Sequence, residues 1–146
     1  MSGEARDACG VVGIYAPGED VARLAYYSLY ALQHRGQESA GIAISEGKTV
    51  VVYKDLGLVS QVFDETVLRS LRGHAAIGHV RYSTTGGTTW ENAQPSYKSS
   101  PVGQIALAHN GNLVNSTALK RSLEEAGGDP TPETARVLSS SDTDLV

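Results

Sequence analysis

The chain has 146 residues, with 12 lysines and arginines against 16 aspartates and glutamates, which gives a formal net charge of -4 at pH 7. A hydrophobic fraction of 40% and a charged fraction of 19% fit one folded domain, or a large piece of one, and exclude a typical disordered segment. The acidic balance argues against a nucleic-acid or anionic-membrane surface. The lack of an apolar run of about 20 residues excludes a transmembrane helix.

The first half of the chain predicts a strand, a helix and a hairpin in succession. Residues 10–15 form a short apolar run closed by a Pro-Gly turn, which indicates a buried strand. A helix is predicted over residues 20–33, where Asp20 is a suitable N-cap and apolar residues cover much of the surface. Residues 40–44 and 49–53 are strand-like and are joined by a short polar turn, which is a hairpin signal.

The second half continues with alternating helices and strands. A helix is predicted over residues 63–71 and a buried strand over residues 75–80. From residue 82 to 103 the composition shifts to serine, threonine, glycine, proline and asparagine, which predicts a long loop, and long ordered loops are often functional. A strand is predicted over residues 104–108, followed by a helix over 115–126 that a Gly-Gly pair ends.

The mixture of hairpins and helices predicts an α+β layered domain. No internal repeat or linker divides it. Residues 139–142 have the composition of the N-cap of a helix whose body is absent, since the chain stops at Val146 just as an element begins, so we expect the domain to be truncated.

The N-terminus and the cysteine content favour a cytoplasmic protein. Residues 1–8 have no apolar core, so they are not a secretory signal. Cys9 is the only cysteine, which rules out an internal disulfide and suits a reducing compartment. A lone cysteine is either a small buried hydrophobe or a nucleophile, and its surroundings must decide between the two.

Four short segments place polar residues and glycine at the end of an apolar strand or helix, where catalytic groups often lie. They are Cys9–Gly10 and residues 34–38, 79–84 and 109–112. Each has a simple structural explanation when taken alone: Arg81 suits a surface ion pair, and Asn110–Gly111 suits a hairpin turn. Their three histidines and the cysteine lack the spacing of a zinc site, so we expect no metal.

Together the segments contain the groups that amide hydrolysis at a thiol needs: a thiolate, a base, oxyanion donors and a substrate clamp. Cys9 supplies the sulfur, while the Asn110 side chain and the Gly111 backbone supply N–H donors. Arg81 can pair with a carboxylate and Asp142 with an ammonium group. No histidine is an obvious base, but a chain beginning at Cys9 would place its own α-amine, with a pKa near ~8, beside the sulfur.

Five strings, in this order, resemble the N-terminal half of amidophosphoribosyltransferases, the enzymes that begin de novo purine synthesis. They are Cys9-Gly-Val-Val-Gly-Ile14, Leu32-Gln-His-Arg-Gly-Gln-Glu-Ser-Ala-Gly-Ile42, Ile77-Gly-His-Val-Arg-Tyr-Ser-Thr84, Leu107-Ala-His-Asn-Gly-Asn-Leu113 and Ser140-Ser-Asp-Thr143. The Cys-Gly, His-Arg-Gly and Asn-Gly motifs are shared with other N-terminal-nucleophile glutamine amidotransferases. The longer strings around His34 and His79 favour the purine enzymes.

The resemblance implies a four-layer αββα sandwich of the N-terminal-nucleophile hydrolase type, incomplete at the C-terminus. It also implies that residues 1–8 are a propeptide and that residues 9–146 are part of a type-2 glutamine amidotransferase domain. A leader of no consequence, or a misassigned start codon, is the alternative for residues 1–8. We expect the phosphoribosyltransferase domain to be absent, because no Asp-Asp diphosphate-binding loop occurs in this sequence.

The resemblance also implies catalytic roles. Cys9 would attack the side-chain amide of glutamine, giving a glutamyl thioester and ammonia, and its freed α-amine would act as general base and then as general acid. Asn110 and Gly111 would form the oxyanion hole. Arg35 and Gly36 would shape the wall beside the thiol.

Further implied residues would bind the α-carbon groups of glutamine. Arg81 would bind the α-carboxylate, with help from Thr84 and the Thr85 backbone, and Asp142 would bind the α-amino group. In the full enzyme, ammonia would displace pyrophosphate from phosphoribosyl pyrophosphate and give 5-phosphoribosylamine. The family implies Mg²⁺ in the transferase domain and a homo-oligomer for the full enzyme, with no cofactor in this chain. The sequence leaves an iron–sulfur cluster outside this chain open.

Two alternatives remain open from the sequence. A related glutaminase of the glucosamine-6-phosphate synthase type shares the shorter motifs, but residues 33–37 and 79–82 count against it. A fragment without catalysis, acting as a binding or regulatory module or without any role, belongs to another class. A retained Met1 would favour that class, because Cys9 would then lack a free amine.

Overall fold

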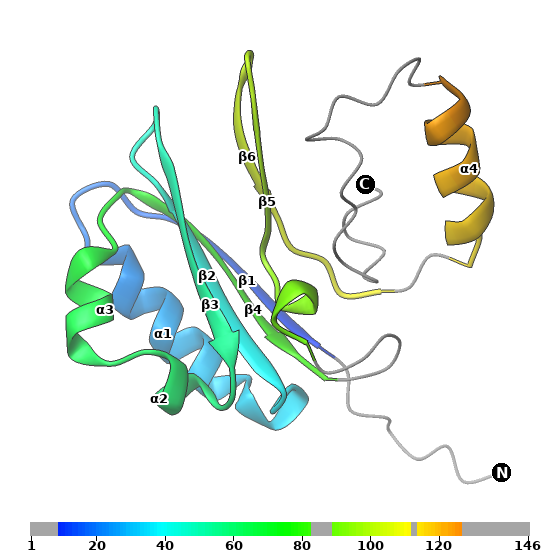
Figure 1. Ribbon diagram of the computed structural model, residues 1–146. Coiled ribbons are helices and arrows are strands. Elements are labelled where there is room, and N and C mark those ends of the chain that lie inside the picture. Colours follow the sequence, from blue (N-terminus) through cyan, green and yellow to red (C-terminus); the bar gives the residue numbers. More distant parts are fainter. Residues whose placement is uncertain (1–8, 83–88, 112–113, 127–146) are drawn as a thin grey trace, which may run out of the picture.

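The computed structural model describes residues 9–82, 89–111 and 114–126. Four strands form its main sheet in the order β1-β4-β2-β3, with every neighbouring pair antiparallel (Figure 1). These strands are β1 (Gly10–Tyr15), β2 (Ser39–Ser45), β3 (Val50–Leu56) and β4 (Ala75–Arg81). A second sheet is the antiparallel hairpin of β5 (Ser96–Ser100) and β6 (Gly103–Leu107).

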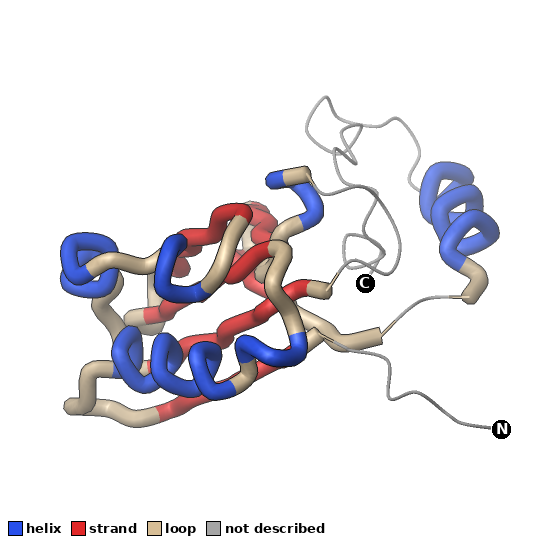
Figure 2. Tube along the Cα trace, turned by 90° about the horizontal axis from the view of Figure 1, so that it is seen from below, coloured by secondary structure: helices blue, strands red, loops and turns tan. Residues whose placement is uncertain are grey.

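Helices cover one face of the main sheet, and the β5–β6 hairpin lies on its other side (Figures 1 and 2). The covering helices are α1 (Val21–Ala31), α2 (Val59–Val62) and α3 (Glu65–Ser70). Two 3₁₀ turns, η1 (Gln33–Arg35) and η2 (Trp90–Asn92), and the helix α4 (Ser116–Ala126) complete the described elements. No helix among these residues is long and apolar enough to cross a membrane.

The hydrophobic core lies between the helix layer and the main sheet. Side chains alternate across a strand, so Ile42 of β2 and Val80 of β4 join Leu29 of α1 in this core. Full burial of an aliphatic side chain of this size contributes about 1.5–3 kcal/mol. A Cβ at Gly78 would lie 2.9 Å from Leu29 Cδ1, so α1 packs directly on the β4 backbone.

The opposite side of the sheet, which we call the hairpin face, carries polar residues of β4. His79 and Arg81 point to this face because they alternate with the core residues Ala76 and Val80, and both are buried. Gly41 of β2 lies beside His79 in the β2–β4 register. The described chain crosses the sheet here, since a Cβ at Gly41 would lie 2.1 Å from the carbonyl oxygen of Gln94.

Most predicted elements are confirmed with small changes in their ends. The strands expected over residues 10–15, 40–44, 49–53, 75–80 and 104–108 are β1, β2, β3, β4 and β6. The helices expected over residues 20–33 and 115–126 are α1 and α4. Asp20 caps α1, because its side chain accepts a hydrogen bond from the Arg23 backbone N–H at 3.1 Å. The Gly-Gly helix stop and residues 139–142 lie outside the described residues, as does the expected propeptide.

The helix predicted over residues 63–71 is wrong at its start. Phe63 is extended and buried, and α3 begins only at Glu65, because the Asp64 side chain accepts the Val67 backbone N–H at 2.8 Å as an N-cap. A separate helical turn, α2, precedes it. The observed helix is therefore shorter than the predicted one at both ends, and α2 was not predicted.

The long loop predicted over residues 82–103 is wrong in part, because η2 and the strand β5 lie within it. In β5 only Ser96 is buried, and the other residues are exposed and mostly polar. A strand of this kind has no alternation of apolar and polar residues, so the periodicity signal is missing. Residues 83–88 lie outside the described part.

The α+β class is confirmed, with antiparallel sheets and a helix layer on one side. From left to right, Figure 1 shows helices, the main sheet, the β5–β6 hairpin and α4. The expected four-layer αββα sandwich remains a prediction.

The close approach at Gly41 makes a sharp test of the fold. Gly41→Ala would place a methyl group against the backbone carbonyl of Gln94, and overpacking of a buried site costs about 1–3 kcal/mol or more. We expect a clear fall in the urea midpoint of unfolding. The matched control is Gly13→Ala on the same face of β1, where a Cβ meets nothing within 4 Å. Equal midpoints for the two variants would contradict the docking of Gln94 on the sheet.

Candidate active site

The thiol of Cys9 lies where β1 begins and β4 ends, because Gly10 pairs with Val80 in the β1–β4 register. The Tyr82 backbone N–H points at the Cys9 Sγ at 3.5 Å, and the thiol lies 3.7 Å from the Tyr82 carbonyl oxygen. Cys9 is partly exposed. It therefore does not belong to the buried core.

The turn after α1 contacts the backbone of Cys9 and the end of β4. Arg35 of η1 donates from Nε to the Cys9 carbonyl oxygen at 3.3 Å. Gly36 packs on the end of β4, where a Cβ would lie 2.7 Å from the Val80 carbonyl carbon and 2.8 Å from the Arg81 backbone. Only a glycine fits this approach without a shift of the backbone. Arg35 thus contacts the Cys9 backbone and Gly36 contacts the end of β4, while their expected role beside the thiol remains a prediction.

Asn110, which lies far from Cys9 in the sequence, also donates a hydrogen bond to the Cys9 carbonyl oxygen. Its Nδ2 donates to the Cys9 carbonyl oxygen at 2.8 Å, across a separation of 101 residues. An amide nitrogen carries two N–H groups, so this hydrogen bond uses one of them. Gly111 follows directly and is exposed. Asn110 therefore lies beside the residue that carries the predicted nucleophile, and its role as an oxyanion donor, like that of Gly111, remains a prediction.

Arg81 takes part in a buried ion pair that the sequence did not predict. Its Nη1 donates to the Glu38 Oε1 at 3.0 Å, and the two side chains are 7% and 9% exposed. The Glu38 backbone N–H also donates to the Arg81 carbonyl oxygen at 3.1 Å. The second carboxylate oxygen of Glu38, Oε2, is buried without a hydrogen-bond partner among the described residues. A guanidinium has five N–H donors, so the Oε1 bond engages only part of it.

His79 of β4 is fully buried beneath the segment that leads to Asn110. Its Nε2 lies 3.2 Å from the His109 carbonyl oxygen, and Gln94 Oε1 accepts the His109 backbone N–H at 2.8 Å. Burial, the largest cause, lowers the pKa of His79 to about 4, although the hydrogen bond to His109 opposes this shift. The imidazole is therefore neutral at neutral pH.

Sequence reasoning missed three contributors to the site: the Tyr82 backbone, the Glu38 carboxylate and the His79 imidazole. Backbone groups carry no signal in side-chain patterns, so Tyr82 could not be found. Glu38 lies three residues after Arg35, in a segment already singled out, but nothing in the sequence pairs it with Arg81. The predicted residues Thr84, Thr85 and Asp142 lie outside the described part of the chain.

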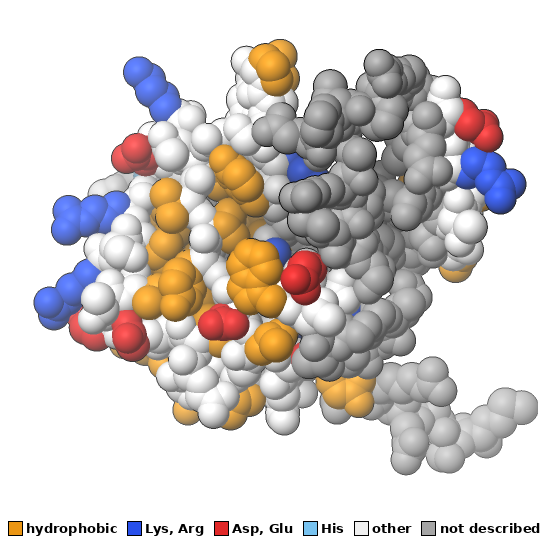
Figure 3. Space-filling view, in the orientation of Figure 1, with side chains coloured by type: hydrophobic (Ala, Val, Ile, Leu, Met, Phe, Trp, Pro, Cys, Tyr) orange, Lys and Arg blue, Asp and Glu red, His pale blue; other side chains and the backbone are white. Residues whose placement is uncertain are grey.

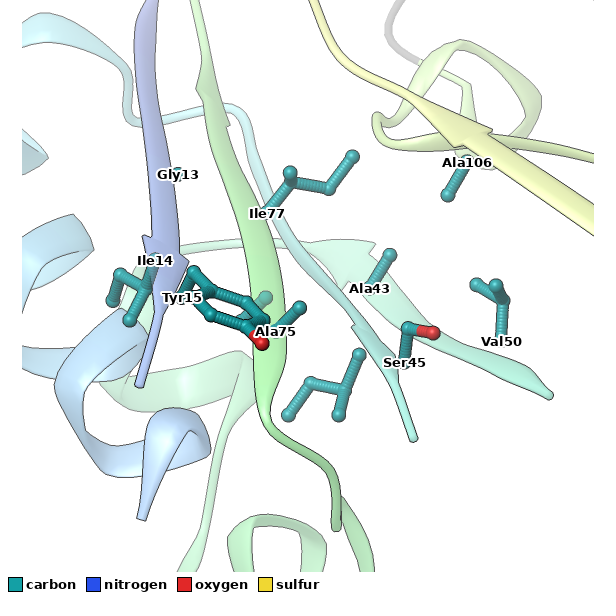
Figure 4. Close-up of a pocket in the computed structure, with 11 residues that line it drawn as sticks. Gly13, Ile14, Tyr15, Ala43, Ser45, Val50, Ala75, Ile77 and Ala106 are labelled. Carbon is teal, nitrogen blue, oxygen red and sulfur yellow. The ribbon is translucent and has the colours of Figure 1, made fainter. Parts of the chain in front are cut away.

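The apolar pocket shown in Figure 4 lies at the other end of the main sheet. Tyr15 and Ser45 both pair with Ala75 there, whereas the thiol lies next to the Gly10–Val80 pair. The edge strand β3 adds exposed apolar side chains, among them Val51, and Figure 3 shows an apolar band on that side. The residues that line the pocket include no cysteine, histidine or charged side chain. Within residues 9–82, 89–111 and 114–126, no three His, Cys, Asp or Glu side chains form a metal-ion site.

The described residues bring together a partly exposed thiol, two N–H donors on the Cys9 carbonyl oxygen and a buried arginine at one end of the main sheet. Residues 20–135 match the family model of the class II glutamine amidotransferases. The chain therefore belongs to the class II glutamine amidotransferase family.

Within that family, the relatives are amidophosphoribosyltransferases. The protein of that name from Mycobacterium tuberculosis strain H37Rv is 64% identical over 123 residues, which are 84% of this chain and 23% of that protein. Glutamine phosphoribosylpyrophosphate amidotransferase from B. subtilis, solved with ADP and GMP, matches with a TM-score of 0.77 at 43% identity, covering 92% of this chain and 27% of that one. A structure described as the allosteric regulatory enzyme of purine biosynthesis gives a TM-score of 0.79 at 45% identity, with 92% and 28% covered. The chain thus spans about a quarter of the length of these relatives.

The buried ion pair gives a prediction about stability. Glu38→Ala would leave the buried Arg81 guanidinium without its carboxylate, and breaking one half of such a pair costs about 3–5 kcal/mol. The control is Glu65→Ala, because Glu65 pairs with Arg23 and Arg69 at the surface, where ion pairs contribute little. Urea unfolding should show a large loss of stability for the first variant only. Similar losses for both would show that the Glu38–Arg81 pair is not buried as described.

Proposed function

We propose that this chain is the glutaminase part of an amidophosphoribosyltransferase, in which Cys9 hydrolyses glutamine to glutamate and ammonia. The observation that carries the proposal is the convergence of Arg35 and Asn110 on the Cys9 carbonyl, next to a partly exposed thiol. Antiparallel sheets with helices on one face of the main sheet and the β5–β6 hairpin on the other side (Figure 1) support an αββα fold of the N-terminal-nucleophile type. The relatives named amidophosphoribosyltransferase support this enzyme over one of the glucosamine-6-phosphate synthase type.

In the proposed reaction, removal of residues 1–8 frees the α-amine of Cys9, which takes the thiol proton. The thiolate attacks the side-chain carbonyl carbon of glutamine, and Asn110 Nδ2 and the Gly111 N–H stabilise the oxyanion that forms. The protonated amine then gives its proton to the leaving nitrogen, which departs as ammonia. Water, activated by the same amine, cleaves the glutamyl thioester, giving glutamate and the free thiol.

The α-carbon groups of glutamine would bind beside this centre. Arg81 would bind the α-carboxylate, with Thr84 and the Thr85 backbone, and Asp142 would bind the α-amino group. Arg81 is the last residue of β4, and the next residue, Tyr82, contacts the Cys9 sulfur. This adjacency along the chain supports a binding site for the α-carboxylate near the thiol.

In the complete enzyme, ammonia would pass to a phosphoribosyltransferase domain with Mg²⁺ and convert phosphoribosyl pyrophosphate into 5-phosphoribosylamine. This is the first committed step of purine synthesis, and we propose a cytoplasmic homo-oligomer as its setting. The relative solved with ADP and GMP is described as a phosphoribosylpyrophosphate amidotransferase, which supports phosphoribosyl pyrophosphate as the second substrate.

Cys9→Ser tests the nucleophile. Serine is the weaker nucleophile at neutral pH, so glutamine hydrolysis by the protein from its natural gene should fall by about a thousandfold or more, with its unfolding midpoint unchanged. A variant that hydrolyses glutamine at the parent rate would remove Cys9 from the mechanism. Intact mass after treatment with 6-diazo-5-oxo-L-norleucine gives a second measurement. We expect loss of residues 1–8 and one adduct in the parent, and no adduct in Cys9→Ser; an uncleaved, unlabelled parent would contradict the proposed function.

Arg81→Lys tests the substrate clamp. A lysine ammonium cannot make the bidentate pair that a guanidinium makes with a carboxylate, so the KM for glutamine should rise by about tenfold or more. Arg23→Lys is the control, because Arg23 pairs with carboxylates at the surface, away from the thiol. A KM equal to that of the parent and of Arg23→Lys would reject carboxylate binding by Arg81.

A further inference from the structure

The backbone N–H and the backbone carbonyl oxygen of His109, the residue before Asn110, each contact a buried side chain. Its N–H donates to Gln94 Oε1 at 2.8 Å, and its carbonyl oxygen lies 3.2 Å from His79 Nε2. His79 is 0% exposed and Gln94 is 5% exposed. A buried polar group is costly unless it is hydrogen-bonded, so these two bonds stabilise both the side chains and the position of the His109 backbone.

The tautomer of His79 follows from its partners. A carbonyl oxygen only accepts hydrogen bonds, so Nε2 must carry the proton that points at the His109 carbonyl. A neutral imidazole has one N–H, which leaves Nδ1 as a bare acceptor, and Nδ1 is buried without a hydrogen-bond partner among the described residues. Burial keeps the ring neutral, since it lowers the pKa to about 4. The His79 side chain therefore acts only as a hydrogen-bond donor to the His109 carbonyl oxygen.

Both anchors are fixed to the main sheet. His79 lies on β4 between Val11 of β1 and Gly41 of β2 in the register. Gln94 is held on Gly41, whose missing side chain leaves room for the Gln94 carbonyl oxygen and for Pro95. The same sheet carries the thiol, because Cys9 directly precedes β1. The anchors therefore tie the turn and the nucleophile to one rigid element.

We infer that His79 and Gln94 are positioning residues that hold Asn110 and Gly111 at the oxyanion position beside Cys9. The inference rests on the proposed function, because it needs these two residues to be the oxyanion donors. Asn110 follows His109 directly and donates to the Cys9 carbonyl oxygen at 2.8 Å. Oxyanion donors act on the transition state more than on bound substrate, so a displaced turn should lower kcat and leave KM nearly unchanged.

The test compares variants that keep or remove each anchor, in the protein from its natural gene. His79→Gln keeps an N–H near the position of Nε2, whereas His79→Leu removes it. Gln94→Glu keeps the accepting oxygen, whereas Gln94→Met removes it. We expect kcat to fall by about tenfold to a hundredfold in the Leu and Met variants, with KM for glutamine within about twofold, and to be largely restored in the Gln and Glu variants. The rate of Cys9 alkylation by iodoacetamide, which needs no oxyanion hole, should be the same in all variants.

Three results would overturn the inference. They are an unchanged kcat in both the Leu and the Met variant, a fall in kcat of equal size in the variants that keep and that remove the hydrogen-bonding group, and a rise in KM as large as the fall in kcat. Histidine ¹⁵N NMR of the parent decides the geometry without any activity, and it also applies if His79→Leu does not fold. We expect His79 to be protonated at Nε2 and bare at Nδ1 at neutral pH, and the opposite tautomer would overturn the inference. A parent that does not hydrolyse glutamine while showing the expected tautomer would instead refute the proposed function.

Discussion

The site depends on a close backbone approach at Gly41. The main sheet buries its other face against α1, α2 and α3, so only the hairpin face is open to receive the rest of the chain. There the carbonyl oxygen of Gln94 lies where a side chain of residue 41 would be, with a built Cβ only 2.1 Å away. This contact fixes the segment that leads into β5 and β6, and β6 ends three residues before Asn110. A side chain at this position would separate the two parts that meet at Cys9.

Three distant parts of the chain meet at one carbonyl group. Arg35 follows α1, Asn110 follows β6, and both donate to the carbonyl oxygen of Cys9. The antiparallel register adds the fourth part, because Gly10 opposite Val80 places the Tyr82 backbone against the sulfur. The thiol is thus located by bonds to its own residue's backbone and by strand pairing. On the proposed function, groups held in this way lose little freedom when substrate binds, which is the basis of preorganised catalysis.

The sequence predicts the strands with regular apolar patterns better than the polar segments between them. Strands β1 to β4 have strong apolar patterns, whereas β5 is polar and exposed and has none. Of the site, the resemblance picks out Cys9, Arg35 and Asn110, since each lies in a short distinctive string. Contacts such as Glu38 with Arg81 join residues that are 43 positions apart, and such pairings depend on strand order, which local patterns do not encode. Thr84, Thr85 and Asp142 remain predictions.

Charge balance links the buried ion pair to the kind of substrate the site suits. Arg81 is already neutralised by Glu38, and both side chains are almost fully buried. A substrate with only a carboxylate would bring an unbalanced negative charge next to Glu38, where screening by water is weak. An α-amino acid carries its own ammonium group beside the carboxylate, so its arrival leaves the local charge unchanged. On the proposed role of Arg81, the Glu38–Arg81 pair therefore favours a zwitterion such as glutamine over a simple carboxylate, and it does so through electrostatics, without any contact to the amide that reacts.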